Sequence, residues 1–106
     1  MANSLIHWKY GVIVINVKNW DEYNKYAALA GPTLKKYTEE CGGKILSRGG
    51  DIINVEGREM NRIVLVEWPS IKHAQDFYNS PEYQNAMKYI NDDVSERFFN
   101  LAESIV

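Results

Sequence analysis

The sequence has little cysteine and no long hydrophobic run. Cys41 is the only cysteine, so an intramolecular disulfide is excluded and a reducing, cytoplasmic location is favoured. The longest purely apolar stretch, Val12 to Ile15, is far shorter than the roughly 20 residues that cross a bilayer. Met1 to Ser4 lack the positive charge and the apolar stretch of a signal peptide. We therefore expect neither a membrane segment nor a secretory leader.

An excess of basic residues is also missing. Twelve Lys and Arg against fourteen Asp and Glu give a net charge of −2, and no basic run exceeds Lys35-Lys36. Nucleic-acid-binding domains carry a concentrated basic surface, so no nucleic-acid partner is expected. A chain of this length forms one hydrophobic core. We therefore predict a single domain over residues 1–106, in which residues 1–9 are an N-terminal extension.

Hydrophobic periodicity predicts a strand followed by a long helical region. Tyr10 to Val17 is rich in Val and Ile, and both of its alternating faces are apolar. Asn19 is a helix N-cap, and apolar residues at helical spacing continue to Cys41. Gly31-Pro32 interrupts this pattern, which predicts a kink or two abutting helices. Gly42-Gly43 is predicted to end this helical region after Cys41.

Three β-type segments follow. Lys44 to Arg48 and Asp51 to Val55 are short runs separated by Gly49-Gly50, a pair suited to a bulge or a sharp bend. Arg62 to Trp68 is a clear strand, and the polar Glu56 to Asn61 before it predicts a hairpin loop.

The remaining residues predict a second interrupted helix and a last strand. Pro69-Ser70 ends the preceding strand and caps a helix, and Ser80-Pro81 restarts that helix. Phe98 to Val106 is apolar and is predicted to be a strand in part.

This order of elements is β-α-β-β-α-β, an α+β ferredoxin-like protomer. Its helices cover only one face of an antiparallel sheet, whereas the first strand is apolar on both faces. The second face therefore needs cover. We expect a homodimer that packs sheet against sheet, a dimeric α+β barrel.

Several motifs support this fold by resemblance. They are Gly43 to Gly50 (GKILSRGG), Glu56-Gly57, Arg62 to Ser70 (RIVLVEWPS) and Ala74 to Tyr83 (AQDFYNSPEY). Through them the chain resembles DUF1330, a bacterial family of uncharacterised proteins in the dimeric α+β barrel superfamily. The resemblance implies the same protomer and dimer but no reaction. Relatives in the superfamily include cofactor-free monooxygenases and lactone isomerases. Ala102-Glu103-Ser104 replaces the Glu-Gly with which family members commonly end the last strand.

Candidate metal ligands and nucleophiles are few. His7, His73 and Cys41 have no metal-ligand spacing, so neither a metal site nor a cofactor is predicted. Cys41 lies at the C-terminal end of its helix, where the dipole disfavours a thiolate, and we interpret it as a packing residue.

The most informative polar pair is Arg48 with Glu67. A hairpin that closes near Gly57 and Arg58 would place the two side chains roughly opposite each other on neighbouring strands. They are then either a structural ion pair or the catalytic residues of a pocket.

Aromatic residues are the other candidates, since the chain has three Trp, seven Tyr and three Phe. Core packing is their ordinary role. Several phenols that converge with Arg48 and Glu67 would instead bind a ligand, and the candidates are Tyr26, Tyr37, Trp68, Tyr78 and Tyr83.

Two functions fit these residues. In the first, a small cofactor-independent enzyme or enzyme-like protein binds an apolar or aromatic metabolite. Arg48 holds a carboxylate or enol oxygen of that metabolite, and Glu67 or a tyrosine moves a proton. In the second, a non-catalytic ligand-binding or structural dimer uses the same residues to hold the barrel together.

Overall fold

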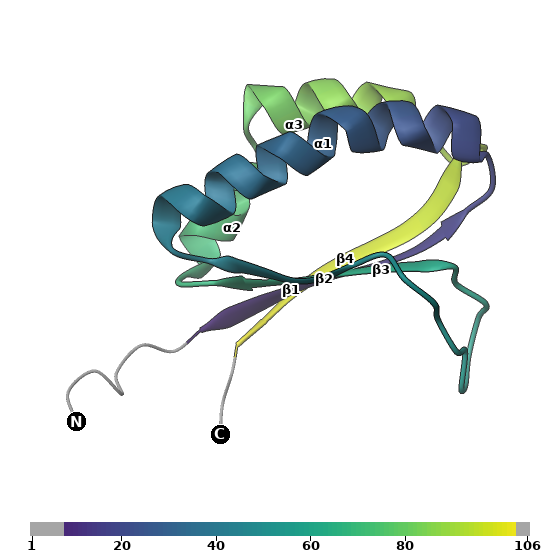
Figure 1. The fold of residues 1–106 in the computed structure, drawn as a ribbon, viewed down its shortest axis with the longest axis horizontal. Helices are drawn as coiled ribbons and strands as arrows, with labels where there is room; N and C mark the ends of the chain where they lie inside the picture. The colour runs from purple at the N-terminus through teal and green to yellow at the C-terminus, as the bar shows by residue number, and fades with distance from the viewer. Residues whose placement is uncertain (1–7, 104–106) are drawn as a thin grey trace.

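The computed structural model describes residues 8–103, which form one four-stranded antiparallel sheet with helices on one face (Figure 1). The strands are β1 (Lys9–Val17), β2 (Lys44–Arg48), β3 (Arg62–Trp68) and β4 (Ser95–Glu103). The helices are α1 (Trp20–Cys41), α2 (Ile71–Tyr78) and α3 (Pro81–Ala86), and α3 is followed by a 3-10 turn, η2 (Met87–Tyr89). The strand order β2-β3-β1-β4 and the β-α-β-β-α-β chain confirm the predicted ferredoxin-like fold.

The core lies between the helices and the upper face of the sheet. In β1 the side chains of Ile13, Ile15 and Val17 are buried there, and they alternate with half-buried residues of the opposite face. In β3, Val64, Val66 and Trp68 face the same core. Period-2 alternation therefore assigns each strand residue to one of two faces, and only one of these faces is covered by helices (Figure 1).

Helix α1 is continuous from Trp20 to Cys41, so of the two predicted alternatives at Gly31-Pro32, two abutting helices do not form. Pro32 removes one backbone donor, but packing of the buried face on both sides of it, from Tyr23 to Thr38, keeps the chain helical. The predicted ends were right. Asn19 caps the helix by accepting from the amide of Glu22 at 3.2 Å, and the Gly42 φ of 80° is the left-handed stop.

Helices α2 and α3 begin where the sequence predicted. Ser70 accepts from the amide of His73 at 3.2 Å, and Ser80 accepts from the amide of Tyr83 at 3.1 Å. Pro81 occupies the first turn of α3, where a missing amide hydrogen costs nothing. The last strand begins at Ser95, three residues before the predicted start at Phe98.

The segment between β2 and β3, residues 49–61, is a long projecting arm that connects two antiparallel neighbouring strands. The predicted strand at Asp51 to Val55 does not form, because β3 already pairs with β2 on one side and β1 on the other. The Asn61 side chain holds the base of the arm: its Oδ1 accepts from the Val17 amide at 2.7 Å and its Nδ2 donates to the Val17 carbonyl at 2.9 Å. Asn54 bonds both backbone groups of Met60 in the same way.

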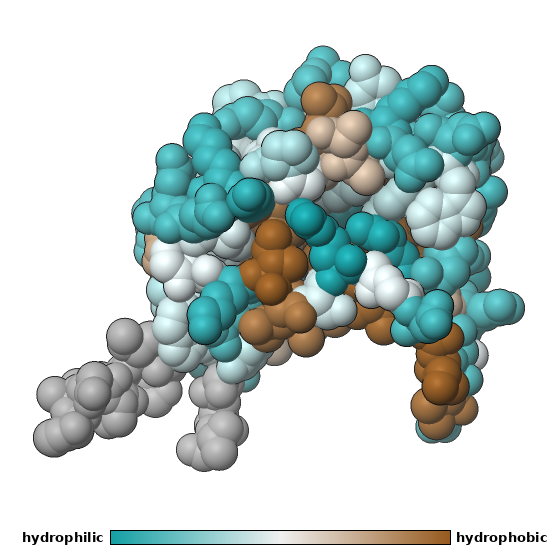
Figure 2. All heavy atoms as spheres, viewed as in Figure 1, coloured by the Kyte–Doolittle hydropathy of each residue, from teal (hydrophilic) through white to brown (hydrophobic). Residues whose placement is uncertain are grey.

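The arm extends past the sheet on the side away from the helices, and hydrophobic atoms lie at its tip (Figure 2). Ile53 and Val55 are 87% and 90% exposed there. The adjoining sheet face is also apolar, because cross-strand rows place Val14 with Ile63 and Phe98, and Val12 with Leu65. Phe98 remains 47% exposed. We call the strand residues Val12, Val14, Ile63, Leu65 and Phe98 the open face. Within residues 8–103, no helix is both long and apolar enough to span a membrane.

Candidate functional site

A cavity of about 600 Å³ lies between α1 and the upper face of the sheet. Its floor is Ile13 and Ile15 of β1 and Val64 of β3, and Phe77 of α2 closes one side. The rest of the wall is mainly the buried side of α1 together with Tyr83 of α3. Tyr23, Tyr26, Ala30 and Leu34 recur at helical spacing, so one face of one helix lines most of the space.

A buried hydrogen-bond chain forms part of this wall. The hydroxyls of Tyr26 and Tyr83 lie 2.7 Å apart, and Nη2 of Arg97 donates to the Tyr83 hydroxyl at 2.7 Å. The Arg97 guanidinium also stacks on the Tyr26 ring, 5.4 Å from its centroid. The two phenols have two hydrogens and use one of them on each other. The second hydrogen is therefore available to an acceptor in the cavity.

Electrostatics keep Tyr26 and Arg97 of this chain protonated at neutral pH. Burial raises the pKa of Tyr26 far above its ordinary value, Tyr83 raises it further, and Arg97 partly opposes them. For Arg97, burial opposes the charged form, but attraction to Tyr26 and Tyr83 outweighs burial and raises its pKa. The arrangement is thus a hydrogen-bond donor backed by a positive charge, and not a general base.

A second arginine lies on the same face of the sheet. Ile15 is paired with Arg62 on one side and with Arg97 on the other, so the two guanidiniums flank it in one cross-strand row. Arg62 lines the cavity, and its guanidinium lies 5.7 Å from the centroid of the Tyr23 ring. Burial raises the pKa of Tyr23, and the charge of Arg62 partly offsets that rise.

Arg48 lines the cavity, but the predicted pairing of Arg48 with Glu67 was wrong. Arg48 lies opposite Val64, whereas Glu67 lies opposite Lys44 on β2 and Tyr10 on β1. A bulge between Ile45 and Ser47 and an arm that does not close as a symmetric hairpin shift the register. Glu67 alternates with the core-facing residues of β3 and belongs to the opposite face, away from the cavity.

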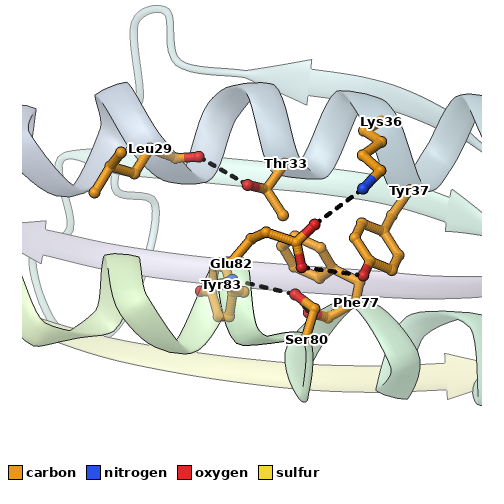
Figure 3. Close-up of polar contacts among 8 residues, drawn as sticks. All are labelled: Leu29, Thr33, Lys36, Tyr37, Phe77, Ser80, Glu82 and Tyr83. Atoms are coloured by element: carbon orange, nitrogen blue, oxygen red, sulfur yellow. Dashed lines mark hydrogen bonds and ion pairs between the residues drawn. The ribbon is translucent and has the colours of Figure 1, made fainter.

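Tyr37 does not line the cavity and instead joins α1 to α3 (Figure 3). Its hydroxyl donates to Oε1 of Glu82 at 3.3 Å, while Lys36 donates to Oε2 of the same carboxylate at 3.0 Å. The Lys36 hydrogen bond is the main cause that lowers the pKa of Glu82. These contacts fix the position of α3 and hence of Tyr83, the next residue along (Figure 3).

Trp68 and Tyr78 also lie outside this cavity. Trp68 is 1% exposed and packs on Phe77 with ring centroids 5.8 Å apart, so it is a core residue. Tyr78, a predicted ligand-binding residue, is 39% exposed and lines a smaller depression of about 300 Å³ with Phe99. Of the predicted site residues the cavity brings together Arg48, Tyr26 and Tyr83.

Sequence reasoning missed Arg62 and Arg97. A usable signal was present, because Arg62 is in phase with Val64, Val66 and Trp68, and Arg97 is in phase with Phe99 and Leu101. A basic residue on the apolar face of a strand is costly to bury unless it has a specific partner.

Residues 8–103 contain no cluster of three His, Cys, Asp or Glu side chains that could hold a metal ion. His73 contacts Ser70 at the start of α2, and Cys41 packs at the edge of the core with its thiol 3.6 Å from the Thr38 carbonyl. His7 lies outside the described residues.

Comparison with known families identifies the chain. A family model described as a domain of unknown function, DUF1330, matches residues 9–102. The chain belongs to the DUF1330 family. No curated protein matches this DUF1330 member significantly.

Several solved structures share the fold of this DUF1330 protein. RPA0582, a protein of unknown function from Rhodopseudomonas palustris, aligns with a TM-score of 0.70 and 15% identity over 95% of this chain and 85% of that chain. A dimeric ferredoxin-like protein of unknown function from Bacteroides fragilis has a TM-score of 0.57 and 14% identity, and covers 92% and 96%. A candidate antibiotic biosynthesis monooxygenase from Nitrosomonas europaea has a TM-score of 0.60 and 15% identity, and covers 92% and 90%. At these identities the similarity shows the fold alone.

Proposed function

We propose that this protein is a small cofactor-independent enzyme or enzyme-like protein that binds an apolar or aromatic metabolite in the α1 cavity. The observation that carries the proposal is the cavity itself, about 600 Å³ with mainly apolar and aromatic walls and a few polar groups. That combination is the usual form of a small-molecule site. It favours a binding protein over a purely structural dimer with a filled core. The single cysteine favours a cytoplasmic setting.

The polar groups of the cavity suit stabilisation of an anion. The described lining residues include no Asp, Glu, His or Cys, so proton removal by an ordinary side-chain base has no support. The spare phenolic hydrogen of the Tyr26–Tyr83 pair, backed by Arg97, can instead stabilise an enolate or phenolate oxygen of the ligand. Monooxygenase-like or isomerase-like chemistry, taken from the superfamily by analogy, would proceed through such an anion.

Ligand retention tests the proposal. Native mass spectrometry of protein purified without added ligand is expected to find a small apolar or aromatic compound at one copy per chain. Ala28 lines the cavity but is exposed, so Ala28→Trp should obstruct the mouth without disturbing the core. Asn24→Trp, which introduces the same bulky side chain at an exposed α1 position outside the cavity, is the control. Retention that is equal in both variants would refute a ligand site in this cavity.

A non-catalytic ligand-binding protein is the second candidate, and the absence of a side-chain base among the described lining residues favours it. The two candidates differ in what happens to the retained compound. An enzyme converts it during aerobic incubation, and Tyr83→Phe slows that conversion more than it weakens binding. A binding protein returns the compound unchanged.

We further propose that two copies pack through their open faces. Val12, Val14, Ile63, Leu65 and Phe98 form adjacent apolar rows, and the arm carries Ile53 and Val55 beside them. Solvent exposure of this much apolar surface is unfavourable, and a two-fold interface buries it on both copies at once. The Bacteroides fragilis neighbour is described as dimeric, which supports a dimer of this fold.

Light scattering tests the dimer. A stable interface of this kind buries at least about 1,000 Å² in total, so a dimer is expected at micromolar concentration. Val14→Lys places a charge at the centre of the open face and should produce monomers, while Lys72→Glu on the exposed side of α2 should not. A wild-type protein that is monomeric at micromolar concentration would contradict the proposal.

A further inference from the structure

The cavity is positively charged although the protein as a whole is not. Its lining includes Arg48, Arg62 and Lys35, and no acidic residue among those described, in a chain whose net charge is −2. The ion pairs within residues 8–103 use other cations: Lys9, Lys25, Lys36, Arg58 and Lys72. The guanidiniums of the cavity wall therefore have no carboxylate partner in this part of the chain. Arg62 is half-buried while Arg48 and Lys35 are exposed, and a cleft lined by charges of one sign attracts ions of the opposite sign.

Arg62 is the group whose position is most restricted. Its Nε is buried and has no hydrogen-bond partner among the described residues. Its guanidinium rests near the Tyr23 ring, with a centroid distance of 5.7 Å. Gly49 lies against its other side, where an added Cβ would come within 3.0 Å of Nη1. The side chain is thus held at the cavity wall, and its positive charge has no carboxylate partner among the described residues.

Arg48 lies at the same cavity on a neighbouring strand. Arg48 is opposite Val64, two residues after Arg62 on β3, and both arginines belong to the helix-facing side of the sheet. An added Cβ at Gly31 would lie 3.7 Å from Nη1 of Arg48, so this guanidinium extends from β2 to α1. Two cations from adjacent strands consequently line one cavity, and apolar residues form the remaining wall.

We propose that the ligand is an aromatic or apolar carboxylic acid whose carboxylate is bound by Arg62, with Arg48 as a second cation. This inference rests on the proposed binding function and names the class of ligand. A carboxylate pairs well with a guanidinium and would supply the anionic partner that Arg62 lacks among the described residues. The apolar body of the acid would lie between Ile13, Ile15 and Tyr26, toward the spare phenolic hydrogen.

Matched ligand pairs provide the test. Benzoate, 2-naphthoate and indole-3-acetate are titrated by calorimetry against the corresponding neutral amides, and phenyl phosphate serves as an alternative anion. The acids should bind at least tenfold more tightly than their amides, and 2-naphthoate more tightly than phenyl phosphate. Equal binding of acids and amides would overturn the inference but leave the proposed function intact. Failure of every acid and amide to bind, together with no retained ligand, would overturn both.

Variants locate the anion site. Arg62→Met keeps an apolar stem without the charge and should reduce the preference for acid over amide to less than twofold. Lys72→Met removes one positive charge from an exposed ion pair on α2 and should keep the full preference. Arg62→Lys retains charge without the planar edge and should give an intermediate preference, so a folding failure of Arg62→Met does not prevent the test. A full preference in either Arg62 variant would refute its role.

Discussion

The hydroxyl of Tyr83 makes hydrogen bonds to two partners, Tyr26 and Arg97. Removing this hydroxyl should therefore reduce the free energy of unfolding more than the loss of either hydrogen bond alone. Tyr83 is 1% exposed, accepts from Arg97 at 2.7 Å and lies 2.7 Å from the Tyr26 hydroxyl. A hydrogen bond from a charged group contributes about 1.5–3 kcal/mol and a neutral one about 0.5–1.5 kcal/mol. Tyr83→Phe should therefore destabilise the protein by about 2–4.5 kcal/mol, whereas Tyr26→Phe should cost only about 0.5–1.5 kcal/mol.

Urea unfolding at one fixed chain concentration measures these losses, since a dimer's apparent stability depends on concentration. A double-mutant cycle of Tyr83→Phe with Arg97→Met should give a coupling energy of at least about 1 kcal/mol, because the two residues share the charged bond. Tyr26→Phe is the internal control, since it removes one hydroxyl of the same size from the same wall. A Tyr83→Phe loss no larger than that of Tyr26→Phe would refute the assignment of Tyr83 as the centre of the chain.

Three further predictions concern pH, a close contact and the base of the arm. The raised pKa of Tyr26 means that the folded state holds its proton more tightly than the unfolded state, whose value is near 10.0. This stabilisation is complete below that pH and is lost as the pH rises through the higher folded-state pKa, by up to about 1.4 kcal/mol per pH unit. Thermal melts of wild type and Tyr26→Phe should converge above pH 10. Gly43→Ala would bring a Cβ within 2.6 Å of the Glu67 carbonyl oxygen, so denaturant unfolding should show a loss of about 1–3 kcal/mol, and an unchanged midpoint would contradict this contact. Asn61→Ala removes both hydrogen bonds to Val17 and should cost about 1–3 kcal/mol in the same assay and speed proteolysis of the arm; equal cleavage rates would show that this contact does not hold the arm.

The sequence predicted the elements well where a periodic apolar pattern coincided with a local signal for an end. The strand from Arg62 to Trp68 and the helix caps at Asn19, Ser70 and Ser80 are examples, because capping depends on residues only a few positions apart. The alternative of two helices meeting at Pro32 and the strand at Asp51 to Val55 were wrong for the opposite reason. Tertiary packing decides whether a helix continues past a proline and whether an apolar run finds a free strand to pair with.

The candidate site was predicted less completely, because it depends on register. Tyr26 and Tyr83 were identified from their helical faces, which the period of an α-helix fixes locally. The relation of Arg48 to Glu67 depended instead on where the chain turns between β2 and β3. A bulge and an asymmetric arm moved Glu67 opposite Lys44. Arg62 was overlooked because a charged residue at the start of a strand is ordinarily interpreted as a surface residue, unless the face of the sheet on which it lies is known.

The continuous helix α1 has a consequence for how this chain tolerates insertions and deletions. One face of it supplies Tyr23, Tyr26, Ala30 and Leu34 to the same cavity. Each inserted residue rotates everything after it by about 100° around the helix axis, so a single insertion near Ala28 would turn Ala30 and Leu34 away from the sheet. Residues 50–60 of the arm line no part of that cavity and can change in length without such a rotation. For the cavity, length variation is therefore more disruptive in α1 than in the arm, although a change in the arm also alters the position of Ile53 and Val55 beside the open face.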